Sequence, residues 1–531
     1  MNAVNRLLWC SILAAAACGQ SVVPRDGEDA ADSTADSHST EGCDGAALVS
    51  ARPIYPPSGA VFTSRAVRFR WTTTARTSAV EVCSDRSCGR VVARVNVGAQ
   101  ETTIPDLPAG ALYWRVVPDG CVRATSVAWQ VYVASRTASV GAAWSGPVDV
   151  NGDGYSDLAV VQFNPDRVLL YVGGAMGIAT TPVAVLDSSR IPLGVSDWVG
   201  SAGDVDGDGI VDLFVASDST VHVFFGETSG SFSRSDSLFP APGGPRSNPR
   251  VAGAGDVNGD GYADLLVGSS SRTAGSSWLY YGTSRGFPLT PDVTLRSPPD
   301  VRNFGGDVGG VGDVNADGYS DIVVTAPGPI PEGTSDAILF FGTSAGPDLA
   351  RPVRLPRGSP SNAGGFVRGS GDVNGDGYPD VLFYDANVGS AIYLGASAGD
   401  PQLFTRLTRA VYPVLPAFDV TGDGLDDIVA QRQSLDPPSL ADVYLSNRTG
   451  LIQSWSAIVE GRNGFSMTTG DYNGDGLGDV AVGVPEAGEV RIYYGTAAGL
   501  PATPSAVIRG PAGGQFGQFV ASLREHGGPA A

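Results

Sequence analysis

A nine-residue segment rich in aspartate occurs seven times between residues 149 and 479. Every copy has Asp at positions 1, 5 and 9, Gly at position 6, and Asn, Asp or Thr at position 3. Side-chain oxygens at positions 1, 3, 5 and 9, with the backbone carbonyl of position 7, form the oxygen-only ligand set that Ca²⁺ prefers. The predicted metal ligands are Asp149, Asn151, Asp153, Tyr155 and Asp157; Asp204, Asp206, Asp208, Ile210 and Asp212; Asp256, Asn258, Asp260, Tyr262 and Asp264; Asp313, Asn315, Asp317, Tyr319 and Asp321; Asp372, Asn374, Asp376, Tyr378 and Asp380; Asp419, Thr421, Asp423, Leu425 and Asp427; and Asp471, Asn473, Asp475, Leu477 and Asp479.

We number these segments loops 1 to 7 in chain order. A single copy is equally well explained as an Asp/Gly turn held by local side-chain bonds, but seven copies with the same three aspartates favour metal binding. Thr421 replaces the amide or carboxylate at position 3 and marks the weakest site. Position 12 of loop 1 is Val160, inside an apolar run, so the loops are not EF-hands, which need Glu there.

The charge of the chain agrees with bound cations. The 34 basic and 55 acidic side chains give a net charge of −21, which is the wrong sign for a nucleic-acid partner. No basic run lies beside any loop, so each carboxylate cluster would repel itself without cations. Seven calcium ions would bring −21 to −7. We therefore expect about seven structural Ca²⁺, bound at roughly 10⁻⁴–10⁻³ M, and a calcium-dependent fold.

The elements around the loops repeat as well. The first aspartates are 55, 52, 57, 59, 47 and 52 residues apart. An apolar strand follows most loops, such as residues 265–267, and a second strand ends in aromatic residues and Gly, such as 279–282. Three to four strands in each repeat are typical of one blade of a β-propeller.

These repeats resemble the FG-GAP repeats of the integrin α-chain propeller, also known as VCBS-like repeats in bacterial surface proteins. Phe304-Gly305 and Phe516-Gly517 supply the Phe-Gly element, whereas Trp198-Val199 stands where another is expected. The resemblance implies an all-β, seven-bladed propeller over residues 139–523, with ions that brace the blades. Residues 515–522 are interpreted as the strand that closes the ring; a truncated eighth blade is the alternative.

A different all-β pattern precedes the repeats. Residues 49–136 show alternating strands and resemble a fibronectin type III domain through the stretch Leu107 to Tyr113, with Trp71 and Trp114 expected in the core. The four cysteines that follow residue 18 predict two disulfides, with the pairing Cys83–Cys88 and Cys43–Cys121 favoured among the three possible ones. A metal site is a poorer reading because CxxC pairs are absent.

The first residues indicate export. Residues 1–17 read as a signal peptide, and the run that ends at Cys18 resembles a bacterial lipobox, which implies lipidation of Cys18; an ordinary secretory signal is the alternative. Residues 18–48 are expected to form a disordered acidic tether, and residues 524–531 a tail. We expect an outer-membrane lipoprotein, or a cell-surface or extracellular protein of a bacterium, whose only membrane contact is the lipid anchor.

No catalytic constellation emerges from the sequence. The three histidines, His38, His222 and His526, are far apart, and His222 is expected on the solvent side of a strand. The sequence therefore predicts a non-catalytic, calcium-stabilised surface interaction or adhesion protein that binds an unidentified protein or glycan through the propeller. The alternative is an exported enzyme of the polysaccharide lyase or phosphodiesterase type that uses the propeller as a scaffold.

Overall fold

The computed structural model describes residues 51–522. It leaves out within that range residues 56–59, 63–64, 109, 121–123, 134–148, 154, 192–198, 209, 218–219, 239–248, 270–274, 299–303, 328–333, 361–364, 377, 386–388, 397–399, 408–409, 417–418, 424, 433–438, 448–449, 460–465 and 512–514. The predicted signal peptide, Cys18, the tether, Cys43, Cys121 and the tail lie outside the described residues.

The first eight strands form a β-sandwich, which we call the N-terminal sandwich. Its sheets have the orders β1-β3-β6 and β2-β8-β7-β4-β5. Both sheets contribute to one core, in which Trp71 and Trp114 are buried as expected. The strands are β1 (Ala51–Tyr55), β2 (Ala60–Phe62), β3 (Val67–Thr73), β4 (Ser78–Cys83), β5 (Val91–Val97), β6 (Glu101–Ile104), β7 (Gly110–Pro118) and β8 (Trp129–Val133).

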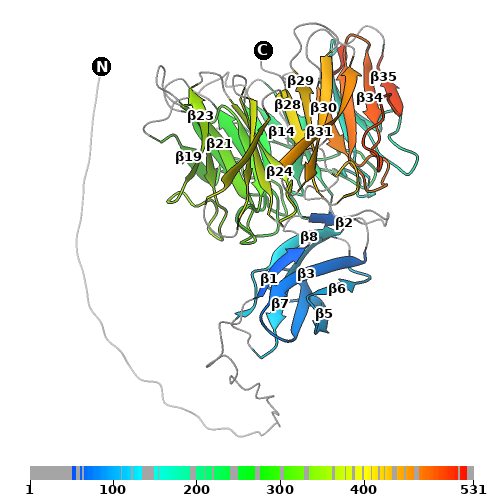
Figure 1. Cartoon of the computed structure of the whole chain (residues 1–531). Helices are drawn as coiled ribbons and strands as arrows, with labels where there is room; N and C mark the ends of the chain where they lie inside the picture. The colour runs from blue at the N-terminus through cyan, green and yellow to red at the C-terminus, as the bar shows by residue number, and fades with distance from the viewer. Residues whose placement is uncertain are drawn as a thin grey trace, which may run out of the picture. The chain divides into compact units, whose positions relative to one another are not determined.

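The other described strands form seven four-stranded antiparallel sheets, six of them from consecutive strands (Figure 1). Polar loops between short apolar strands favour this meander because each strand pairs with the next along the chain. The first sheets contain β9 (Leu158–Phe163), β10 (Arg167–Tyr171) and β11 (Ala184–Leu186); β12 (Val199–Gly203), β13 (Asp212–Ala216), β14 (Val221–Phe224) and β15 (Ser235–Leu238); and β16 (Arg250–Gly255), β17 (Asp264–Ser269), β18 (Ser276–Tyr280) and β19 (Val293–Arg296).

The later sheets follow the same scheme. They contain β20 (Val308–Gly312), β21 (Asp321–Pro327), β22 (Thr334–Phe340) and β23 (Val353–Pro360); β24 (Gly365–Gly371), β25 (Asp380–Asp385), β26 (Gly389–Leu394) and β27 (Gln402–Leu407); β28 (Ala410–Pro416), β29 (Ile428–Arg432), β30 (Ser439–Asn447) and β31 (Gly450–Val459); and β32 (Met467–Gly470), β33 (Asp479–Val484), β34 (Glu489–Tyr493) and β35 (Ala506–Arg509).

The last strand joins the two ends of the propeller. β36 (Gln515–Ser522) pairs antiparallel with β9, so the chain's final segment completes its first sheet in the order β11-β10-β9-β36. The first strands of the sheets contact one another in the sequence β12, β16, β20, β24, β28, β32 and β36, and β36 returns to β12. The expected ring closure is confirmed, and residues 515–522 do not begin a further blade.

Buried apolar residues fill the space between each sheet and the next. Between the first and last sheets, for example, Leu158, Tyr171, Ile492 and Phe516 belong to one cluster. Each sheet therefore buries both of its faces, which explains why the strands after the loops are continuous apolar runs rather than alternating ones.

Phe516 provides a test of the closure. Its side chain is fully buried, and its ring meets that of Tyr171 edge to face at 6.3 Å. Phe516→Ala should lower the free energy of unfolding by about 3–5 kcal/mol, measured by urea denaturation, because a large core side chain is lost. Met176→Ala, at a fully exposed side chain, is the control. An unchanged urea midpoint for Phe516→Ala would show that β36 does not complete the first sheet.

Candidate metal centre

The aspartate loops share one hydrogen-bonded skeleton. In all seven, the position-1 carboxylate accepts the backbone N–H of position 5 through Oδ1, at 2.9–3.1 Å. The position-5 carboxylate in turn accepts the N–H of position 7 at 2.9–3.1 Å. The position-6 glycines Gly261, Gly318 and Gly476 have φ of 89–98°, the left-handed region that lets the chain turn back on itself. Successive carboxylates are therefore gathered on one side of a tight turn.

Position 3 adds a further oxygen to this group. In five loops its Asn donates through Nδ2 to the position-5 carboxylate at 2.8–3.1 Å. In loop 2 the carboxylate oxygens of Asp204, Asp206 and Asp208 lie within 4.8 Å of one another. Thr421 of loop 6 donates its hydroxyl to Asp419 at 3.3 Å. Positions 1, 3 and 5 thus lie together as the sequence predicts, and an all-oxygen set at this spacing suits a hard divalent cation.

Position 9 has a second role that sequence reasoning missed. Its aspartate is at most 1% exposed in every loop. One oxygen accepts the N–H of position 2 at 2.8–3.0 Å. The other accepts, at 2.8–3.1 Å, an N–H at the third strand's C-terminal end: in six sheets that of a glycine just after the strand, and in the remaining sheet that of Ser446 near the end of β30. The position-9 carboxylate therefore links its loop to the sheet by hydrogen bonds, whether or not it also coordinates a cation.

Neighbouring loops are also bonded to each other. The N–H of position 8 donates to the position-1 carbonyl of the preceding loop at 2.9–3.3 Å, as in Ser320 to Asp256, and Ser156 of loop 1 donates to Asp471 of loop 7. This contact joins six of the seven loop pairs. At the remaining pair, loops 4 and 5, position 8 is Pro379, which has no N–H to donate. Backbone hydrogen bonds therefore link each of these six pairs of adjacent loops directly.

Burial and like charge act together on the loop carboxylates. Burial, and after it the negative charge of the Asp317 carboxylate, raise the pKa of Asp313 to about 8. Burial likewise raises the pKa of Asp427 to about 7 and that of Asp256 and Asp471 to about 6. The position-9 carboxyls Asp212, Asp264, Asp380 and Asp479 have pKa values well above the ordinary range, with burial as the main cause. A cation held among these groups would remove the cost of ionising them.

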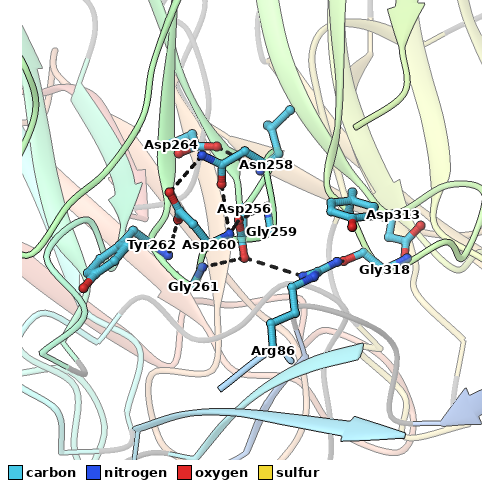
Figure 2. Close-up of polar contacts among 12 residues, drawn as sticks. Arg86, Asp256, Asn258, Gly259, Asp260, Gly261, Tyr262, Asp264, Asp313 and Gly318 are labelled. Carbon is cyan, nitrogen blue, oxygen red and sulfur yellow. Dashed lines mark hydrogen bonds and ion pairs between the residues drawn. The ribbon is translucent and has the colours of Figure 1, made fainter. Parts of the chain in front are cut away.

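Arginine side chains lie beside loops 2, 3 and 4, although no basic run adjoins any loop along the sequence. Arg234 pairs with Asp206, the extra carboxylate of loop 2, at 2.7 Å. Arg86, from the N-terminal sandwich, lies 3.7 Å from the Asp256 carboxylate of loop 3 and donates to the carbonyl of Gly318 in loop 4 (Figure 2). Arg86 was not among the predicted site residues because it is far from the loops along the chain.

The raised pKa values set the pH dependence of the calcium-free protein. A carboxyl whose pKa is higher in the folded state binds its proton more tightly there, so stability falls as pH rises from the unfolded pKa towards the folded one. We expect the free energy of unfolding without calcium to decrease from about pH 4 to pH 8, by about 1.4 kcal/mol per pH unit for each titrating group. Thermal melts after dialysis against chelator test this. With saturating calcium the slope should reverse, because protons then displace the ion; equal slopes in both conditions would contradict the prediction.

The titratable groups outside the loops do not gather into a site among the described residues. His222 is 7% exposed, not solvent-facing as expected. It lies on the same face of β14 as Phe224, which packs in a core cluster shared with the first sheet, and the Ser237 hydroxyl of the paired strand β15 lies 3.0 Å from its Nδ1. Glu81 lies beside Cys83 and Cys88, but these cysteines form the predicted disulfide. The other predicted disulfide involves Cys43 and Cys121, which are not described.

Within the described part of the chain, no helix is long and apolar enough to cross a membrane.

The family models that match this chain describe the same repeats. The FG-GAP-like repeat matches residues 204–267 and 419–482, and the FG-GAP repeat matches residues 304–338. Integrin alpha-IIb of Mus musculus is 35% identical over 140 residues, which cover 24% of this chain and 14% of that protein. Integrin alpha-3 of Cricetulus griseus is 32% identical over 142 residues, covering 24% of this chain and 13% of the relative. The chain spans about one seventh of the length of these curated relatives.

Solved structures with a similar backbone trace have low sequence identity to this chain. Rhamnogalacturonan lyase YesW is 13% identical, with a TM-score of 0.33 over 86% of this chain and 77% of the lyase. A putative 6-phosphogluconolactonase from Bacteroides uniformis is 13% identical, with a TM-score of 0.43 over 68% of this chain and 98% of that one. The matched repeats and the ring of four-stranded sheets agree with each other: the chain has the β-propeller fold and contains FG-GAP repeats similar to those of integrin alpha chains.

Proposed function

We propose that this protein is a non-catalytic, calcium-stabilised interaction protein that binds a protein or glycan partner through its propeller. One observation carries the proposal: seven aspartate loops with the same hydrogen-bond pattern follow one another around the ring. Their repeats are similar to those of integrin alpha chains. A ring with identical loops at every sheet is more consistent with bracing than with a catalytic centre, which needs different groups at one place.

Calcium would be held at each loop by the side-chain oxygens of positions 1, 3 and 5 and the carbonyl of position 7, with position 9 in support. The bound ion supplies positive charge to a cluster of buried carboxylates, and so keeps them ionised without mutual repulsion. The loop residues hold the ion, bend the backbone and connect adjacent sheets. Calcium would thus stiffen the surface to which a partner binds rather than take part in a reaction.

The disulfide supports an exported location. Cys83 and Cys88 are bonded in the N-terminal sandwich, and disulfides persist in oxidising compartments outside the cytosol. We propose that the protein is exported, with the predicted signal peptide as its targeting segment and Cys18 as the attachment point of a lipid. Mass spectrometry of the mature protein from membranes would test the lipid: a diacyl or triacyl modification at Cys18 is expected, and an unmodified chain with a different N-terminus would contradict it.

The test of the function is binding of the purified protein to arrays of glycans and cell-surface proteins. Binding to one defined class of ligand is expected in calcium and should be lost in chelator. A variant with Asp→Asn at position 5 of all seven loops is the matched control and should bind no better in calcium than in chelator. Cleavage of the bound ligand, followed as a change in its mass, would overturn the non-catalytic assignment and favour the enzyme alternative.

A further inference from the structure

Arg86 lies at the tip of a short, closed hairpin in the N-terminal sandwich. The hairpin connects β4 to β5, and the Cys83–Cys88 disulfide closes it. The Asp85 carboxylate accepts the backbone N–H groups of Gly89 at 3.0 Å and Arg90 at 2.8 Å. These bonds hold the tip in one shape, so Arg86 is presented from a stiff support rather than from a loose loop.

The guanidinium of Arg86 fits between loops 3 and 4 of the propeller. Its side chain is 16% exposed. One nitrogen donates to the carbonyl of Gly318, and the other lies 3.7 Å from the Asp256 carboxylate. The guanidinium carbon lies 4.2 Å from the centre of the Tyr319 ring, at a distance typical of cation–π contacts. Figure 2 shows Arg86 directed between Asp256 and Gly318. A fixed positive charge therefore stands beside two aspartate loops.

The two loops are shaped to receive the sandwich. Position 4 of loop 4 is Ala316, with φ of 55°, where the other six loops have Gly; its methyl group packs against the core of the sandwich. Gly261 of loop 3 has no room for a side chain, since a Cβ there would lie 2.5 Å from the hydroxyl oxygen of Tyr113. At Gly318 a Cβ would lie 2.8 Å from the carbonyl oxygen of Ala128. These contacts come from three separate parts of the sandwich, so the fit does not depend on Arg86 alone.

We propose that Arg86 is a fixed cation shared by loops 3 and 4. It holds the N-terminal sandwich on the propeller, and its charge lowers the affinity of loop 3 for a divalent cation. Asp256 is the position-1 carboxylate of loop 3, and the same oxygen that faces Arg86 accepts the N–H of Gly261 at 3.0 Å. A calcium ion bound there would be repelled by the guanidinium and would weaken its attraction to the carboxylate. Calcium binding at loop 3 and the contact of the sandwich with the propeller therefore oppose each other. By linkage, each lowers the equilibrium constant of the other by the same factor. This inference rests on the proposed binding of calcium.

Calorimetric titration of calcium into the full-length protein tests the effect on affinity. Arg86→Gln should tighten one class of sites by about tenfold, as expected for removing one unit charge close to a doubly charged ion. Arg90→Gln is the matched control: it removes the same charge from the same hairpin at an exposed side chain, and its isotherm should equal that of the wild type. Arg86→Lys keeps the charge and should retain the weak class. Equal isotherms for the wild type and Arg86→Gln would overturn the inference, as would an Arg86→Lys isotherm like that of Arg86→Gln.

Hydrogen exchange gives a second readout that does not depend on the calorimetry. In the wild type, calcium should increase amide exchange in the hairpin from Cys83 to Cys88, while in Arg86→Gln calcium should leave the exchange of this hairpin unchanged. Hairpin exchange in the wild type that calcium leaves unchanged would overturn the coupling. If no calcium binds to the wild type or to any variant, the proposed calcium function itself fails; if calcium binds but Arg86→Gln changes nothing, only this inference fails.

Discussion

Removal of calcium is expected to lower the melting temperature of the protein by on the order of ten degrees or more. At 2 mM calcium and a dissociation constant of about 10⁻⁴ M, each site adds roughly 1.8 kcal/mol to the free energy of unfolding. Seven such sites would add roughly 12 kcal/mol, which is comparable to the whole stability of an ordinary domain. The effect is large because each loop gathers carboxylates at least partly out of water.

Differential scanning calorimetry in calcium and in chelator is the measurement. Magnesium at the same concentration is the control for charge screening, because Mg²⁺ demands a small octahedral site and should restore little of the loss. A melting temperature that is the same in chelator and in calcium would show that the loops are turns held by their own hydrogen bonds.

Asp264→Asn should destabilise the protein in calcium and in chelator alike, by about 3–5 kcal/mol. The Asp264 carboxylate is fully buried and accepts the N–H of Val257 at 2.9 Å and that of Gly282 at 3.1 Å. An amide has only one acceptor oxygen, so one buried N–H would face an NH₂ group and lose its partner. This loss arises from the bond between loop and sheet, and adding calcium cannot restore it.

Asp260→Asn is the matched comparison in the same loop. Asp260 occupies position 5 and is more exposed, with Tyr262 and Asn258 as its hydrogen-bond donors. Its substitution should cost about 0.5–1 kcal/mol in calcium, the contribution of one site weakened by Arg86, and little in chelator. Urea denaturation of both variants in both conditions separates the two roles. If Asp264→Asn lost stability only in calcium, position 9 would act as a ligand and not as the tie to the sheet.

The fold was predictable because its pattern repeats. Seven aspartate loops at similar spacing, each followed by an apolar strand and a strand ending in an aromatic residue and Gly, define a sheet of fixed size. The Phe516-Gly517 element without a loop indicated that β36 completes a sheet begun elsewhere. Positions 1, 3 and 5 could also be grouped in advance, since residues two apart in a tight turn lie together on one side.

The remaining features depend on contacts that the sequence does not encode locally. The partner of each position-8 N–H is a backbone carbonyl of the preceding loop. Every residue has a backbone carbonyl, so the residue types do not indicate which one accepts the bond. Arg86 lies 232 residues from Gly318, and no spacing rule relates a hairpin of the sandwich to a loop of the propeller. His222 was expected to face solvent because alternation along β14 does not reveal that both faces of this strand pack against neighbouring sheets.

The missing bond at Pro379 makes one joint of the ring mechanically different from the other six. Across that joint Arg368 of β24 pairs with Asp307 at 2.7 Å, and both side chains are buried. The N-terminal sandwich also bridges it: Arg86 contacts loop 4, and Arg52 stacks on Tyr378 of loop 5 at 4.1 Å. A pulling force that enters the propeller through these two arginines is therefore borne at the one joint without the loop-to-loop bond. There the ion pair and the stacked arginines add to the bond from the Ala396 N–H to the Val314 carbonyl and to an apolar core that both sheets share.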